Sequence, residues 1–362
     1  MKKHEYQSII KIGSKLVSNH HPTYFIADIG ANHDGDLKRA KDLIKLCADA
    51  GADAAKFQHF KAETIVSDDG FKILDPKFLS HQSSWKKTVF DIYKEASINL
   101  DWDEELKKTC DSAGIEYLTT PYDPDLVDHI DKYVSAYKVG SGDITWTQNI
   151  KKIASKGKPV ILASGASTLD EVVRAANTIL DVNPQLSILQ CNTNYTGSLN
   201  NFDYINLNVF KTLGNMYPNL VLGLSDHTPG HATAVGAVAL GGRIIEKHFT
   251  DDNLRSGPDH GFAMNPISWR KMVDVTRELE RALGSGIKRV EENEENTVVI
   301  QRRSLRANKK MISGAILSSN DVDILRPCPQ NALEPWELEK YVGCRVTRNI
   351  EKGEHFKPSD FE

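Results

Sequence analysis

Short apolar runs alternate with amphipathic stretches along most of the chain. The runs that suit buried parallel strands are 24–28, 54–58, 116–120, 136–139, 159–164, 186–190, 220–225 and 243–248. Apolar side chains recur every three or four positions over 37–50, and Thr168 with Glu171 forms a capping box; both patterns predict helices. Eight strand–helix units in about 250 residues predict an α/β fold, the (β/α)8 TIM barrel.

The pattern changes beyond about residue 285. A charged stretch at 288–296 marks a boundary, and short strand-like segments follow it. We therefore predict a barrel domain over 1–286, a linker over 287–298 and a small β-rich domain over 299–362. Because about 64 residues make a marginal core by themselves, we expect the small domain to dock on another surface.

An aromatic insertion runs from about Ser67 to Leu100, after the second predicted strand. Its position allows two interpretations. It either folds over the mouth of the barrel or is a simple elaboration of the scaffold.

Composition excludes several classes of protein. The chain has 362 residues and a formal net charge of −4, and it contains no basic block of the kind that binds nucleic acid. No apolar stretch reaches the roughly 20 residues that span a bilayer, and the N-terminus does not look like a secretory signal. Five unpaired cysteines indicate a reduced, cytoplasmic protein. Among them Cys191 ends a predicted strand and fits a packed small side chain better than a site residue.

Two histidines end neighbouring predicted strands. His227 and His248 are 248 − 227 = 21 positions apart, the length of one barrel step, and each has a carboxylate beside it, Asp226 and Glu246. Two neutral imidazoles can bind a borderline divalent metal whose remaining positions are filled by water and substrate. The spacing therefore predicts an open metal site at the mouth of the barrel.

Further polar side chains follow the predicted strands and should converge on the same mouth. Lys56 and Lys138 end apolar runs, and because a buried ammonium is costly without an anion, they suggest a bound phosphate or carboxylate. Together they fit a small dianionic substrate. The whole expected set is Asp28, Asn32, His33, Lys56, Gln58, Thr120, Lys138, Ser141, Asp143, Ser164, Tyr195, Ser225, Asp226, His227, Glu246, His248 and Asp259.

Several motifs along the chain carry a family resemblance. They are Asp28-Ile-Gly-Ala-Asn32-His33-Asp-Gly35, Ala55-Lys56-Phe-Gln58, Thr120-Pro-Tyr122, Tyr137-Lys138-Val-Gly-Ser-Gly-Asp143, Ser164-Gly165, Gly223-Leu-Ser-Asp-His227-Thr, Glu246-Lys-His248-Phe and Gly257-Pro-Asp259-His. In this order they resemble the sialic acid synthase family, the phosphoenolpyruvate-dependent synthases of nonulosonic acids. The tail from about Val298 resembles that family's antifreeze-like SAF domain.

The resemblance implies a transferase in which a domain-swapped homodimer brings Arg326 of one subunit to the barrel mouth of another. It implies that His227 and His248 bind a divalent metal, typically Mn²⁺, with Mg²⁺ or Co²⁺ as alternatives. It also implies the remaining roles. The residues expected to hold phosphoenolpyruvate or the sugar are Lys56, Gln58, Thr120, Tyr122, Lys138, Ser141, Ser164, Tyr195, Ser225 and Asp226, and the expected catalytic carboxylates are Asp28, Asp143, Glu246 and Asp259.

Three positions near the expected sugar depart from the family pattern. Asp28 and Asp143 stand where many bacterial members have Glu, and Tyr195 is followed by Thr rather than Pro. The acceptor is expected to be N-acetylmannosamine or, alternatively, a 2,4-diacetamido-6-deoxy hexose that gives legionaminic acid. Two other classes stay open: a metal-independent aldolase with a Schiff-base lysine (Lys56, Lys138 or Lys247), and a non-catalytic sugar-binding protein.

Overall fold

The structure is a computed structural model that describes residues 4–79, 82 and 85–362. The chain divides into two compact units, Met1–Gly284 and Ser285–Glu362. Each unit is described by itself.

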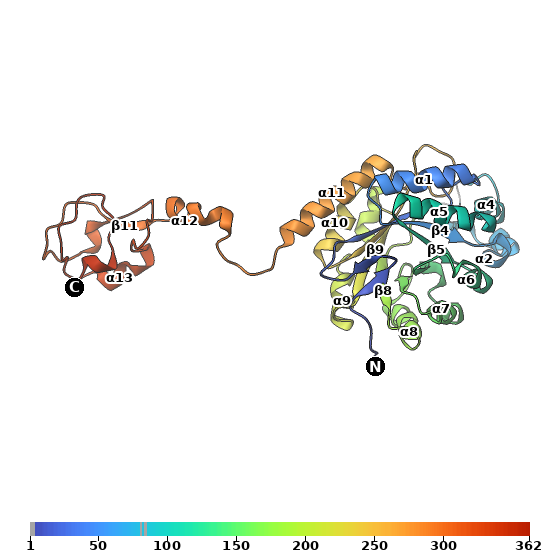
Figure 1. Ribbon diagram of the computed structural model, residues 1–362, viewed down its shortest axis with the longest axis horizontal. Coiled ribbons are helices and arrows are strands. Elements are labelled where there is room, and N and C mark those ends of the chain that lie inside the picture. The colour runs from blue at the N-terminus through green and yellow to red at the C-terminus, as the bar shows by residue number, and fades with distance from the viewer. Residues whose placement is uncertain (1–3, 80–81, 83–84) are drawn as a thin grey trace. The chain divides into compact units, whose positions relative to one another are not determined.

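The first unit is built on a closed parallel barrel of eight strands (Figure 1). In barrel order they are β3 (Tyr24–Asp28), β4 (Ala54–His59), β5 (Glu116–Pro121), β6 (Tyr137–Val139), β7 (Val160–Ala163), β8 (Leu186–Cys191), β9 (Val221–Asp226) and β10 (Ile244–His248). β10 pairs with β3 and closes the barrel. The predicted fold is therefore confirmed, and each strand lies within a residue or two of its apolar run because these runs are buried on both faces.

Helices surround the barrel and connect its strands (Figure 1). They are α1 (Leu37–Asp49), α2 (Ala62–Ile65), α3 (Asp68–Ile73), α4 (Val89–Ala96), α5 (Asp103–Ala113), α6 (Pro124–Ile130), α7 (Thr147–Ala154), α8 (Leu169–Leu180), α9 (Val209–Met216), α10 (Ala232–Ala239) and α11 (Pro266–Leu283). The capping box predicted for α8 is present, with Thr168 and Glu171 bonding each other's backbone N–H. α2, α3 and α4 belong to the insertion after β4.

An N-terminal hairpin contributes to the apolar filling of the barrel. Its strands are β1 (Ile10–Ile12) and β2 (Lys15–Val17), and Ile10, Ile12 and Val17 pack in one cluster with Tyr24 and Ile244 at the starts of β3 and β10. The amino-terminal end of the barrel is thus filled with hydrophobic side chains, and the polar residues that follow the strands lie at the opposite end.

The second unit has its own small core. It contains α12 (Glu295–Gln301), the antiparallel pair β11 (Ser304–Ala307) and β12 (Val322–Leu325), and α13 (Leu338–Tyr341). Leu305, Met311, Ile350 and Phe356 are among its fully buried side chains. Within the described residues of the chain, we find no helix long and apolar enough to cross a bilayer.

Candidate functional site

A cavity of about 400 Å³ opens at the carboxyl ends of the barrel strands. This volume suits a small-molecule ligand. Most of the site residues expected from the sequence line it: Asp28, Lys56, Gln58, Thr120, Tyr122, Lys138, Ser141, Asp143, Tyr195, Ser225, His227, Glu246, His248 and Asp259. The carboxyl ends of parallel strands thus bring together residues that are up to 231 positions apart in the chain (259 − 28 = 231).

Some expected residues do not line the cavity. The Asp226 carboxylate forms a buried ion pair with Lys247 and accepts hydrogen bonds from Thr228 and Thr233. Side chains alternate along a strand, so Asp226 and Lys247 point to the opposite side from their neighbours His227 and His248. Asp226 as a substrate ligand is therefore corrected to a buried structural residue, and Lys247 does not face the cavity as a Schiff-base lysine would.

Three more predictions of position need correction. The Ser164 hydroxyl donates to the Leu189 carbonyl at 3.0 Å, along the neighbouring strand. Asn32 donates to the backbone of Phe249, and the His33 ring lies 5.8 Å from that of Trp102, outside the cavity lining. Ser164 and Asn32 thus donate to backbone carbonyls, His33 packs against Trp102, and none of the three lines the cavity.

Arg326 follows β12 in the second unit. Its expected role in another subunit's site stays a prediction.

The two histidine rings lie together at one side of the cavity, with centroids 5.5 Å apart. His227 Nδ1 donates to the carbonyl of Asn192 at 2.9 Å; burial would lower the pKa of this ring, but its interaction with Cys191 raises it. Burial lowers the pKa of His248 to about 4, which keeps this imidazole neutral at physiological pH. Its buried Nδ1 has no hydrogen-bond partner among the described residues, although Asp259 lies 3.6 Å away.

These features fit a divalent metal ion bound through two imidazoles. A neutral ring with an available lone pair is the required ligand state, which His248 meets, and its unpartnered Nδ1 is an atom that such an ion would satisfy. Among the described residues no cluster of three or more histidine, cysteine or carboxylate side chains is arranged to hold a metal. Such an ion would therefore keep positions open for water and substrate.

Two buried lysines share carboxylates beside the histidines, and Asp28 Oδ2 lies 3.4 Å from His248 Nε2. Lys56 Nζ lies 2.7 Å from Asp28 Oδ2 and 3.8 Å from Glu246 Oε1, and Lys138 Nζ lies 3.7 Å from Glu246 Oε2. Burial alone would lower the pKa of Lys56, but the two carboxylates raise it above its usual value. Burial lowers the pKa of Lys138, because Glu246 compensates only in part and the charge of Lys56 opposes it.

Lys138 has fewer hydrogen-bond acceptors than its three N–H donors could use. Its ammonium donates to the Val139 carbonyl at 3.1 Å, while Glu246 Oε2 is buried and accepts no hydrogen bond from any described residue. Both lysines, with Thr120 3.4 Å from Lys56, can therefore still donate to an anion. The site can hold a phosphate or carboxylate at this end.

A hydroxyl and a glycine complete the lysine end. The Gly165 N–H donates to Ser141 Oγ at 3.0 Å, and the Ser141 hydroxyl interacts with Cys191. A side chain at position 165 would clash, because a Cβ there would lie 2.8 Å from Ser141 Oγ and 1.9 Å from Thr193 Oγ1. Cys191 also lines the cavity, contrary to the packed position expected for it; burial would raise the pKa of its thiol, but interaction with His227 lowers it.

The lining of the cavity also includes apolar and aromatic side chains from outside the barrel strands. The insertion predicted at about Ser67 to Leu100 contributes Trp85, Ile92, Tyr93 and Ala96, and Ile65 just before it also lines the cavity; of the two interpretations of this segment, the structure therefore favours the one at the barrel mouth.

Carboxylates face this apolar surface. Gln58 Nε2 donates to Asp28 at 3.1 Å, and burial raises the pKa of Asp143 to about 6. The Tyr195 ring lies 4.4 Å from that of His227. Phe262 packs 4.9 Å from the His248 ring and was missed by the sequence analysis, although it follows Asp259 by only three positions.

An eight-stranded parallel barrel with buried charged residues at the carboxyl ends of its strands is the architecture of a (β/α)8 enzyme. A scan against protein families matches residues 43–288 to the NeuB family. The chain belongs to the NeuB family, as the resemblance of its motifs predicted.

Named relatives agree with this assignment. The chain is 33% identical to an N,N'-diacetyllegionaminic acid synthase of Campylobacter jejuni, covering 92% of this chain and 98% of that protein. It is 31% identical to human N-acetylneuraminate-9-phosphate synthase over 93% of this chain and 92% of that protein. A solved N-acetylneuraminic acid synthetase from Leptospira borgpetersenii, in complex with citrate, superposes with a TM-score of 0.69 at 28% identity and covers 82% of this chain and 96% of that one. These relatives are synthases of nonulosonic acids.

Proposed function

We propose that this protein condenses phosphoenolpyruvate with an open-chain N-acylated hexosamine to give a nonulosonic acid and phosphate. The observation that carries the proposal is one cavity, in a chain of the NeuB family, that holds two buried lysines and two imidazoles around shared carboxylates. A dianion at the lysines and a carbonyl at the imidazoles match the two substrates of such a reaction.

The lysine end would bind phosphoenolpyruvate. Lys56 and Lys138 would donate to its phosphate and carboxylate oxygens, with Thr120, Ser141 and Ser225 as neutral donors. Because these ammonium groups are buried, their attraction for the phosphate is screened little by solvent, and they stabilise the charge that grows on the leaving phosphate.

The imidazole end would receive the aldehyde of the sugar. His227 and His248 would hold a divalent metal ion, Mn²⁺ or alternatively Mg²⁺ or Co²⁺, which supplies Lewis acidity toward a bound carbonyl oxygen. The two rings, Tyr195 and Phe262 confine the space beside this carbonyl.

The proposed bond changes balance as follows. C3 of phosphoenolpyruvate attacks the aldehyde carbon, a C–C bond forms, and the aldehyde oxygen takes a proton to become a hydroxyl. The resulting oxocarbenium-like C2 takes up water, which loses one proton and leaves a hydroxyl on C2. The C2–O bond to phosphate then breaks, phosphate leaves with the electron pair of that bond, and the C2 hydroxyl gives its proton to phosphate as C2 becomes a ketone. Glu246 lies between both lysines with an unpartnered oxygen, and we assign it the proton transfers, with Asp28, Asp143 and Asp259 as the other carboxylates that face the sugar.

We infer that the acceptor is not phosphorylated. Among the described residues that line the cavity, the lysine side chains are Lys56 and Lys138, and both lie beside the strand-end carboxylates. A sugar 6-phosphate would find no further cationic side chain in the described lining of this unit. N-acetylmannosamine meets this condition, and so does a 2,4-diacetamido-6-deoxy hexose. The apolar surface of Ile65, Trp85 and Ile92 favours the second, which carries two more methyl groups.

The test is phosphate release by the purified full chain with phosphoenolpyruvate, Mn²⁺ and a panel of acceptors, with and without EDTA. The proposal expects release that needs both metal and an unphosphorylated N-acylated hexosamine. Metal-independent turnover of pyruvate that borohydride traps on a lysine would instead establish the aldolase class. Equilibrium binding of a sugar without any release, in folded and metal-loaded protein, would establish the non-catalytic class.

A further inference from the structure

The loop that follows β10 carries part of the cavity wall but leaves the barrel. Residues 249–265 connect β10 to α11, and Pro258 and Asp259 from this loop line the cavity. Asp259 lies 3.6 Å from His248 Nδ1, and its carboxylate accepts from the Ala31 N–H at 3.4 Å. The two ends of the loop are joined by the bridge between Phe249 and Met264, but Asp259 lies outside this bridge, so side-chain contacts are needed to set its position.

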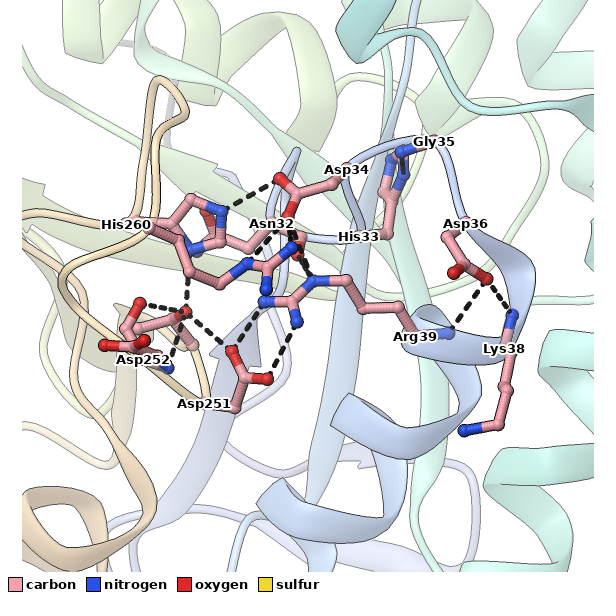
Figure 2. Close-up of polar contacts among 12 residues, drawn as sticks. Asn32, His33, Asp34, Gly35, Asp36, Lys38, Arg39, Asp251, Asp252 and His260 are labelled. Atoms are coloured by element: carbon pink, nitrogen blue, oxygen red, sulfur yellow. Dashed lines mark hydrogen bonds and ion pairs between the residues drawn. The ribbon is translucent and has the colours of Figure 1, made fainter.

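One carboxylate outside the cavity joins this loop to the loop after β3 (Figure 2). Asp34 Oδ1 accepts from His260 Nε2 at 2.9 Å, and Oδ2 accepts from Arg255 at 2.7 and 2.9 Å. Both partners belong to the loop after β10, and His260 is the residue next to Asp259. Asp34 itself adopts a left-handed backbone conformation with φ of +52°, which aims its side chain across the gap between the loops.

A second tether runs beside the first (Figure 2). Arg39, on the first turn of α1, lies 3.1 Å from Asp34 and forms a two-pronged contact with Asp251 at 2.5 and 2.7 Å. Thr250, the residue before Asp251, lies 2.7 Å from His260 Nδ1, so this contact links the second tether to the first. Charged, bidentate hydrogen bonds are stronger than neutral ones, so this hydrogen-bond network is suited to hold the loop in place.

The buried end of the tether has little freedom to move. His260 is fully buried, with both ring nitrogens in hydrogen bonds. A Cβ at Gly257 would lie 2.6 Å from the His260 ring, so the chain passes directly over it. Asn253 donates to the carbonyls of His260 and Ala263, which holds the far side of the loop. A shift of His260 must therefore shift Asp259.

We propose that Asp34 and His260 are positioning residues, which hold Asp259 at the sugar end of the cavity by tethering the loop after β10 to the loop after β3. Neither residue lines the cavity. The kinetic part of this inference rests on the proposed function, because it takes Asp259 as a sugar contact. The structural part, that Asp34 fixes the loop, does not.

The main variant is Asp34→Asn, because Asn tolerates the left-handed backbone and keeps the shape while it removes the charge. The second is His260→Ala, which removes the other partner of the same hydrogen bond. Asp42→Asn is the matched control: this carboxylate pairs with Lys38 at 2.8 Å on the exposed face of α1 and contacts neither loop. Should His260→Ala fail to fold, Thr250→Val removes the buried contact to the same ring and takes its place.

Amide hydrogen exchange of the full chain without substrates gives the first measurement. The proposal expects residues 250–264 to exchange about tenfold faster in Asp34→Asn and His260→Ala, with the barrel strands unchanged and Asp42→Asn equal to wild type. In the double variant these residues should exchange only slightly faster than in the faster single variant, because both residues act through one contact. Unchanged exchange in both single variants would overturn the proposal.

Steady-state kinetics give the second measurement. The KM for the acceptor sugar should rise about tenfold in Asp34→Asn while the KM for phosphoenolpyruvate stays within about twofold. Equal rises in both constants, or a loss of kcat alone, would refute a role in placing Asp259. If wild-type protein releases no phosphate with any acceptor, the proposed function fails, and the exchange experiment still decides whether Asp34 fixes the loop.

Discussion

The ion pair between Asp226 and Lys247 lies directly behind the two histidines and offers a sharp test of the site's architecture. Lys247 is 1% exposed and the Asp226 side chain is fully buried. The two residues face each other in the register of β9 and β10, and Lys247 also donates to the Thr228 carbonyl at 2.6 Å. The substitution Lys247→Met keeps the unbranched shape of the side chain up to Cε and removes the ammonium group, which leaves the Asp226 carboxylate buried without a cation.

The expected cost follows from burial. Removing one partner of a buried pair typically destabilises by about 3–5 kcal/mol, because the remaining charge loses its compensation. Asp226 keeps hydrogen bonds from Thr228 and Thr233, so we expect the lower half of this range, about 3 kcal/mol. For a unit of this size, 1 kcal/mol corresponds to roughly 2 °C of Tm, so Lys247→Met should melt about 6 °C below wild type.

Thermal melts of the full chain and a double-mutant cycle with Asp226→Asn provide the assay. Each single variant should be destabilised, and the double variant should be less destabilised than the sum of the two, with a coupling of about 2 kcal/mol. The exposed pair of Lys38 and Asp42 is the control, with an expected coupling below about 1 kcal/mol. The argument is that this buried ion pair stabilises the ends of β9 and β10. Additive effects at positions 226 and 247, or a melting temperature unchanged by Lys247→Met, would refute it.

Three further predictions concern the cavity. EDTA should abolish phosphate release and Mn²⁺ restore it, while His227→Ala and His248→Ala should each weaken Mn²⁺ binding in a titration followed by calorimetry. Burial raises the pKa of Asp143 from 3.8 to about 6, so the folded state binds more protons than the unfolded state between these values and stability falls as pH rises from about 4 to 6; Asp143→Asn should remove this slope and stabilise the protein at pH 7 by roughly 1–3 kcal/mol, measured by denaturant unfolding against pH. Asp28→Glu should press a longer carboxylate toward Lys56 and His248, and kinetics with both acceptors should show a larger loss for the doubly N-acetylated sugar than for N-acetylmannosamine.

The strands of the barrel could be predicted because each is buried on both faces and therefore apolar without interruption. The run 186–190 became Leu186–Cys191, and the run 24–28 became Tyr24–Asp28. The convergence of Lys56, Lys138 and Glu246 followed from the same property, since the carboxyl ends of parallel strands meet at one end of a barrel. This part of the site depends on topology alone, and topology can be read from periodicity.

The errors came from features that periodicity alone does not settle. Asp226 and His227 are neighbours in the chain, and only the alternation of side chains along β9 and beyond decides which of them faces the cavity. Ser164 lies at a strand end but donates to the adjacent strand. Phe262 and the tether of Asp34 depend on how the loop after β10 folds, and that path is set by contacts 226 positions apart, such as Asp34 with His260.

The part of the cavity on the barrel strands could be predicted better than the part formed by loops. Lys56, Lys138 and Glu246 each lie on a barrel strand, so the closed sheet fixes them within one framework, and a buried cation must find an anion wherever the sheet places it. The rest of the lining includes side chains from the segment after β4 and from the loop after β10, where contacts such as that of Asp34 with His260 hold the chain. Substitutions in these loops can reshape this part of the cavity while the lysines stay in place. Under the proposed function, acceptor preference should therefore be sought in these loops and the shared chemistry at the strand ends.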